Sequence, residues 1–142
     1  MHKKFYASGF LYHLPTQQIL LQQDTTSENF SNQWFLFGGR YTEKELPEDV
    51  FKKIIANLLQ IRIDLVHAVY SYETDDASQH IVYSEIDELI EFSSQNGLLF
   101  NWFPFKNMHK MQISEQTKHD IIVGQRVIEA SGRKSRGEHT FQ

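Results

Sequence analysis

Residues 34–63 constrain the fold of this chain more than any other stretch, because they combine several local signals in one order. The segment reads as a short strand, a loop at Gly38 and Gly39, an acidic turn, a helix and the start of another strand. A glycine pair lets the backbone adopt positive φ and approach a ligand closely. We expect the helix to begin near Pro47, since proline is well tolerated in a first helical turn and the two acidic residues after it suit the helix dipole.

This stretch resembles the signature of the Nudix hydrolases, Gly-x5-Glu-x7-Arg-Glu-U-x-Glu-Glu-x-Gly-U, in which U is a bulky apolar residue. With Gly39 as the first glycine, Glu45 falls on the first glutamate of the signature. Lys53 stands at the arginine position, and Ile55 and Ile61 occupy the two U positions. The resemblance implies an α/β fold of the Nudix type, an α/β/α sandwich with a mixed β-sheet, over nearly the whole chain.

The residues just before the helix also resemble the family's usual approach to this signature. Trp34 is followed by Gly38, Gly39 and the basic Arg40, although Phe37 stands where proline is common. By resemblance, Gly38, Gly39 and Arg40 are the candidate substrate-binding residues. The ligand implied by the family is a small nucleotide-like molecule.

The main departure from the family lies on the helix. Ile54, Asn57 and Leu58 occupy the positions of the three helix glutamates, and Gln60 replaces the second glycine. In the family, those glutamates hold Mg²⁺ or Mn²⁺ against a pyrophosphate. Positions i, i+3 and i+4 share one helix face, so carboxylates there converge on hard cations that require oxygen ligands. Two aliphatic side chains and one amide cannot do this, so we predict no metal site, and Mg²⁺ or Mn²⁺ is implied by the resemblance alone.

Three other carboxylates are candidate catalytic residues. Glu45 belongs to the signature, and Glu43 lies two positions before it in the acidic turn. Glu85 lies in a later predicted strand, and some Nudix enzymes use an acidic residue from beyond the signature. Each has an ordinary alternative, since a solvated acidic turn and an exposed strand carboxylate are common.

Two functions follow from the resemblance. The first is an active hydrolase of nucleoside diphosphates linked to another moiety, in which Glu45 and either Glu43 or Glu85 replace the missing ligands. The second is a descendant with little or no activity that retains the cleft at residues 38–40 and binds a ligand or a protein. We expect the second, because no neighbouring residue of the signature supplies the lost charge.

The helix over residues 48–60 carries one broad apolar stripe. A stripe at helical spacing is usually packed in a core, so a more deeply buried helix is the expected meaning. The alternative is an apolar pocket or a partner surface at the position of the metals. The stripe is formed by Val50, Phe51, Ile54, Ile55, Leu58 and Leu59.

The remaining elements are predicted from alternation and turn signals. Residues 5–14 and 18–23 are expected to form a hairpin whose first strand is covered on both faces, followed by a polar loop over residues 24–32. A strand over residues 61–73 is predicted to bulge at residues 65–66, where the alternation changes parity.

A further strand is expected over residues 79–87. The aromatic residues 101–105 form either a clamp between sheet and helix or a stacking surface for a base, and we expect the clamp. Ser114 is a candidate cap for a final helix.

Composition excludes several other classes. The 142 residues are 40% hydrophobic and 13% aromatic, which is typical of one packed domain, expected over residues 1–131 with a polar tail at 132–142. A net charge of −4 argues against a general nucleic-acid binder, and the absence of cysteine excludes disulfides.

No apolar run is long enough for a membrane span, and the first residues resemble a strand more than a signal peptide, so we expect a cytoplasmic protein. The resemblance leaves a homodimer open, since many Nudix proteins are dimers.

Overall fold

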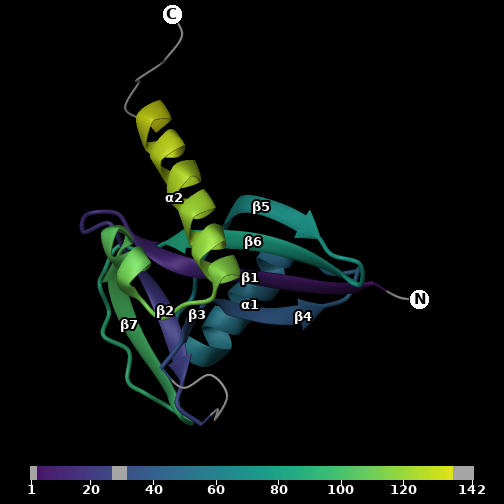
Figure 1. The fold of residues 1–142 in the computed structure, drawn as a ribbon, viewed down its shortest axis with the longest axis horizontal. Helices are drawn as coiled ribbons and strands as arrows, with labels where there is room; N and C mark the ends of the chain where they lie inside the picture. Colours follow the sequence, from purple (N-terminus) through teal and green to yellow (C-terminus); the bar gives the residue numbers. More distant parts are fainter. Residues whose placement is uncertain (1–2, 27–31, 136–142) are drawn as a thin grey trace, which may run out of the picture.

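The computed structural model describes residues 3–26 and 32–135 and shows a mixed sheet between helices (Figure 1). The elements in chain order are β1 (Lys4–His13), β2 (Gln18–Asp24), β3 (Trp34–Phe35), β4 (Phe37–Tyr41), α1 (Pro47–Leu59), β5 (His67–Glu73), β6 (Ala77–Glu85), β7 (Leu98–Pro104), the 3₁₀ helix η1 (Phe105–Lys110) and α2 (Glu115–Ser135).

Strand β1 is the centre of the sheet. It runs parallel to β6 along one edge, while its other edge is shared by β4, at the start of β1, and by β2, at its end. The strand order is β3-β2-β1-β6-β5, with β4 added beside β1 and β7 beside β2. The mixed sheet predicted from the resemblance is confirmed, and so is the hairpin of β1 and β2.

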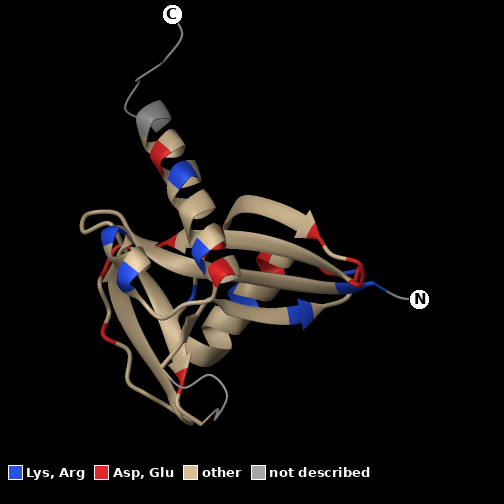
Figure 2. Ribbon diagram, viewed as in Figure 1, with Lys and Arg blue, Asp and Glu red and all other residues tan. Residues whose placement is uncertain are grey.

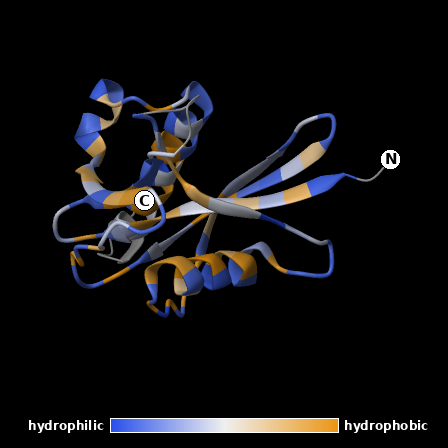
Figure 3. Cartoon of the chain, turned by 90° about the horizontal axis from the view of Figure 1, so that it is seen from below, coloured by the Kyte–Doolittle hydropathy of each residue, from blue (hydrophilic) through white to orange (hydrophobic). Residues whose placement is uncertain are grey.

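The two helices cover opposite faces of the sheet, and helical segments lie on both sides of the strands in Figure 3. Successive side chains of β1 alternate between these faces. Phe10 packs in the cluster that contains Ile121 of α2, and Leu11 packs in the cluster that contains Phe51 of α1. Both residues are fully buried, so the prediction that this strand is covered on both faces is confirmed.

Helix α1 is amphipathic in the predicted way. Its stripe packs into the core through Val50, Phe51, Ile55 and Leu59, which are buried. The helix ends at Gln60, whose backbone is left-handed, with φ 60°, and whose N–H donates to the carbonyl of Ala56. This conformation favours glycine at the end of a helix. It gives a physical reason for the glycine that the Nudix signature has at this position.

The aromatic segment of β7 acts as the predicted clamp. Trp102 packs against the cluster on the α1 side and donates its indole N–H to the carbonyl of Ile90 at 2.8 Å. Phe103 packs against the cluster on the α2 side and meets the ring of Trp34 edge-on, with 4.8 Å between the ring centroids.

Ser114 accepts a hydrogen bond from the N–H of Thr117, which confirms its capping role for α2.

Three local expectations differ from the structure. Residues 61–66 form no regular strand, because β5 begins only at His67, and the register shift lies between Ala68 and Tyr70 rather than at residues 65–66. The residues 38–39 predicted as a loop lie inside β4. Helix α2 continues to Ser135, so the first part of the predicted tail is helical. Residues 27–31 of the predicted loop and 136–142 of the tail lie outside the described residues, and the division into domain and tail stays a prediction.

Candidate functional site

The glycine pair at residues 38–39 is required by close packing rather than by backbone conformation. Among residues 3–26 and 32–135, positive φ occurs at one glycine only, Gly97, so Gly38 and Gly39 do not use the positive φ that glycine allows. A Cβ atom on Gly38 would lie 2.4 Å from Oγ of Ser8 on the neighbouring strand β1. A side chain at this position would require the Ser8 hydroxyl to move and would also lie 3.0 Å from the carbonyl oxygen of Ala7.

Gly39 faces helix α1. A Cβ atom on this residue would lie 3.0 Å from Cδ1 of Ile54. The Ile54 side chain is half-buried and packs against two clusters of the core, one containing Tyr41 and Val50 and the other containing Phe51. Ile54 therefore fills the space between the helix and the glycine.

The other two helix positions of the signature differ from each other in burial. Leu58 is half-buried against the same cluster as Phe51, whereas Asn57 is exposed. The core explanation of the apolar stripe therefore holds for Ile54 and Leu58. Within residues 3–26 and 32–135, no group of three or more His, Cys, Asp or Glu side chains is arranged to hold a metal ion.

Glu45 closes the turn between β4 and α1. Its Oε1 accepts hydrogen bonds from the backbone N–H of Thr42 at 3.0 Å and from the hydroxyl of Thr42 at 3.2 Å. Its Oε2 lies 3.9 Å from Nζ of Lys53, which stands at the arginine position of the signature. The backbone hydrogen bond from Thr42 is the largest cause of a lowered pKa for Glu45, so this carboxylate is ionised and already engaged in local contacts.

Arg40 and Glu43 line one hollow at the start of β1. The hollow has a volume of ≈ 520 Å³. It is lined by Lys3, Lys4, Phe5, Arg40, Tyr41, Thr42 and Glu43.

Glu85 lies apart from these residues. It is the last residue of β6, opposite Tyr12, whereas Ala77 at the first position of β6 lies opposite Lys4 at the hollow. At about 3.3 Å per residue, Glu85 is roughly 26 Å along the strand from Ala77. The structure thus brings Arg40 and Glu43 together near Glu45, and it does not bring Glu85 to them.

The sheet face that carries Arg40 also carries a row of polar and aromatic side chains. The strand register places Arg40 opposite Tyr6 and Tyr6 opposite Gln79. Gln79 in turn lies opposite Tyr72. Paired residues share one face of the sheet, so these four side chains form a row across it. Helix α2 crosses this face farther along, where Gly124 approaches Phe10, and the strand ends near the N-terminus extend beyond the helix (Figure 1). Sequence reasoning missed the row, because four strands contribute to it and alternation does not reveal their register.

A buried carboxylate borders this row. Asp120 of α2 is 4% exposed and accepts hydrogen bonds from the hydroxyl of Tyr70 at 2.5 Å and from the side-chain amide of Gln116 at 2.9 Å. Burial raises the pKa of Asp120, and burial together with the bond to Asp120 raises the pKa of Tyr70. The ring of Tyr70 lies 5.5 Å from that of Tyr72, so the network also fixes one end of the row. The two bonded residues are 50 positions apart, and no sequence signal joined them.

The sequence itself matches no protein-family model and no curated protein. Similar solved structures exist. One comes from a study of MutT from Aliivibrio salmonicida and Vibrio cholerae, with a TM-score of 0.70 and 13% identity over 89% of this chain and 98% of that one. Another is the Nudix domain of Shewanella oneidensis NrtR in complex with ADP-ribose, with a TM-score of 0.66 and 14% identity over 90% and 88% of the two chains. A MutT/Nudix family protein from Listeria innocua gives a TM-score of 0.68 and 12% identity over 94% and 97%.

These likenesses cover nearly the whole of both chains, at identities that establish the fold alone. They agree with the order of elements found here, in which the strand, turn and helix of residues 34–60 follow a hairpin and precede the last helix. The chain has the Nudix fold, and the resemblance to Nudix proteins predicted from residues 34–63 is confirmed.

Proposed function

We propose that this protein binds a nucleotide-like small molecule, of the class of nucleoside diphosphate derivatives, and does not hydrolyse it by the metal-assisted route of the family. The observation that carries the proposal is the packing of Ile54 against Gly39, at the helix position where the family has a carboxylate. Leu58 supports it, because it is also half-buried in the core.

The residues present do not fit a divalent metal centre of the Nudix kind. Mg²⁺ and Mn²⁺ are held by oxygen ligands, and a bound metal would polarise the phosphate and lower the pKa of the attacking water. Ile54 and Leu58 offer no oxygen, and Asn57 offers one amide oxygen on an exposed side chain. These residues therefore support no metal-assisted catalytic step.

One observation favours the alternative of an active pyrophosphohydrolase with non-standard carboxylates. Glu43 and Glu45 lie in one turn, and Glu43 lines the same hollow as Arg40. Against it, Glu45 is engaged with Thr42 and Lys53, and Glu85 lies at the far end of β6. Of the three candidate carboxylates, Glu43 alone is then left to hold a metal ion, whereas the family uses three helix glutamates.

The part of this sheet face beyond α2, where Arg40 is exposed and Tyr6 and Tyr72 are half-buried, supports the binding part of the proposal. Tyr6 and Tyr72 offer aromatic surface on which a base can stack, and such stacking contributes about 1–3 kcal/mol per base. Arg40, on the same face, offers planar hydrogen-bond donors suited to phosphate. The NrtR Nudix domain, which shares this fold, was solved with ADP-ribose, so that compound is a suitable first probe.

The test is a panel of nucleoside diphosphate derivatives that includes ADP-ribose. Turnover is measured with Mg²⁺ or Mn²⁺, and binding is measured by titration calorimetry in EDTA. We expect at least one compound to bind without turnover. Metal-dependent turnover that disappears in Glu45→Gln would defeat the proposal in favour of the active alternative.

Two further predictions concern the cellular location and the oligomeric state. Within the described residues, no helix is long and apolar enough to cross a membrane. A cytoplasmic location and a homodimer stay predictions, and size-exclusion chromatography with light scattering tests the second.

A further inference from the structure

We infer that the hollow at the start of β1 is an anion subsite that binds phosphoryl oxygens through Lys4 and Arg40. The inference rests on the proposed function, since the phosphoryl groups would belong to the proposed nucleotide-like ligand. It assigns to two side chains the charge neutralisation that metal ions supply in the family. Binding of the phosphates is therefore independent of divalent metal.

The register brings the two cations together. Tyr6 of β1 lies opposite Arg40 of β4, so Lys4, two residues before Tyr6, is the diagonal neighbour of Arg40 on the same face. Diagonal neighbours are about 7–8 Å apart, a spacing that long side chains can bridge. Figure 2 shows basic segments at the start of β1 and in β4, in a protein whose net charge is −4.

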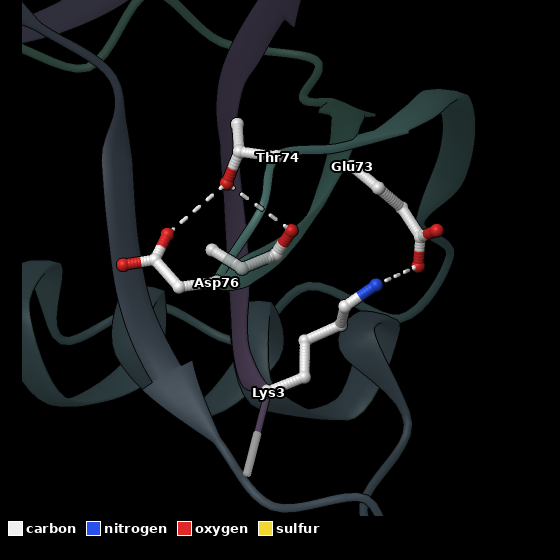
Figure 4. A network of polar contacts seen from close by, with 5 residues as sticks. Lys3, Glu73, Thr74 and Asp76 are labelled. Atoms are coloured by element: carbon white, nitrogen blue, oxygen red, sulfur yellow. Dashed lines mark hydrogen bonds and ion pairs between the residues drawn. The ribbon is translucent and has the colours of Figure 1, made fainter. Parts of the chain in front are cut away.

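A network of polar contacts fixes the start of β1 and neutralises a third cation there. Lys3 forms an ion pair with Glu73 at 2.9 Å (Figure 4). The backbone N–H of Lys4 donates to the carbonyl of Asp76 at 3.0 Å. The hydroxyl of Thr74 lies 3.4 Å from Oδ1 of Asp76 and secures the same turn. The strand end is thereby held in place, and the charge of Lys3 is matched.

The two remaining cations are available to a ligand. Lys4 and Arg40 are exposed, and neither forms an ion pair within residues 3–26 and 32–135. Glu43 is the one acidic side chain among the residues that line the hollow, and it is exposed. The hollow of ≈ 520 Å³ thus combines two unmatched positive charges with one negative charge that an anion would repel.

These charges predict opposite effects for matched substitutions. Lys4→Gln and Arg40→Gln should each weaken anion binding about tenfold, the loss expected for one hydrogen bond to a charged group. Glu43→Gln should strengthen it, because a like charge is removed. Lys106→Gln, an exposed lysine of η1 at the other end of β1, should change nothing.

The experiment uses inorganic pyrophosphate and ADP-ribose as probes, both titrated calorimetrically in EDTA at low ionic strength, where exposed charges act most strongly. Circular dichroism and melting curves confirm that each variant is folded. We expect pyrophosphate to bind the wild-type protein, to compete with ADP-ribose, and to respond to the four substitutions as described. No pyrophosphate binding in EDTA, or equal weakening by Lys106→Gln, would overturn the inference.

Failure of this inference is distinguishable from failure of the proposed function. ADP-ribose that binds equally well to wild type, Lys4→Gln and Arg40→Gln would overturn the anion subsite and leave the proposed function standing. Pyrophosphate binding that depends on Lys4 and Arg40, with no binding of any nucleoside diphosphate derivative, would refute the proposed function and support the subsite for free phosphates.

Discussion

Restoring a glutamate at residue 54 tests whether the position of the family's carboxylate is now part of the core. Ile54 is half-buried between two apolar clusters and contacts Gly39. Burial of a half-buried isoleucine side chain contributes about 1 kcal/mol, which the substitution removes. Placing a carboxylate among aliphatic side chains costs about 1–3 kcal/mol more. We therefore expect Ile54→Glu to lower the free energy of unfolding by about 2–4 kcal/mol, or the melting temperature by roughly 10 °C.

Urea denaturation at neutral and acidic pH measures this cost and its origin. Burial raises the pKa of the introduced carboxyl in the folded protein above its unfolded value of about 4.3. The charge penalty is therefore absent below the unfolded pKa, grows as the pH rises toward the folded pKa, and is complete above it.

Asn57→Glu is the matched control, because residue 57 lies on the same helix and its side chain is exposed. We expect it to change stability by less than about 0.5 kcal/mol. The same modest effect for Ile54→Glu, or an unchanged melting temperature, would show that residue 54 is solvated and would refute the packing argument. Adding Leu58→Glu to Ile54→Glu should increase the loss, since Leu58 is also half-buried.

Three further predictions concern other parts of the fold, each measured by urea or thermal denaturation. Gln60→Gly should stabilise the protein by about 0.5–1 kcal/mol, because a left-handed backbone strains glutamine more than glycine, and a loss would contradict this. Gly124→Ala should destabilise it by about 1–2 kcal/mol, although alanine favours helices, since its Cβ would lie 2.8 Å from the buried ring of Phe10; a gain would refute that contact. Burial raises the pKa of Asp120 above the usual 3.8, so the stability that this residue contributes is full below that value and falls as the pH rises toward the folded pKa. Asp120→Asn should therefore cost less at about pH 7 than at about pH 3, and an equal cost at both would contradict the raised pKa.

The order of elements could be predicted from the sequence because its signals are local. The apolar spacing of α1 and the alternation of β1 each arise within one segment, and both identify buried faces correctly. The replacement of the helix carboxylates by Ile54, Asn57 and Leu58 can also be read directly from the residues. What remained open was whether the aliphatic side chains there are packed or exposed.

The features that the sequence did not predict depend on contacts between distant segments. Gly38 looked like a loop residue because its requirement comes from Ser8 on another strand. The hydrogen bond between Tyr70 and Asp120 depends on where helix α2 lies on the sheet. The diagonal placement of Lys4 next to Arg40 depends on strand register. Periodicity encodes neither. Alternation also extended β5 too far, since apolar residues in irregular segments such as 61–66 can alternate by chance.

A crystal structure of the protein soaked with Mn²⁺ and ADP-ribose tests the central claim most directly. Anomalous scattering locates Mn²⁺ independently of the nucleotide. We predict ADP-ribose on the sheet face beside Arg40, with no anomalous peak within coordination distance of residues 54–58. A manganese ion held by that helix would contradict the claim that apolar packing has replaced the metal centre.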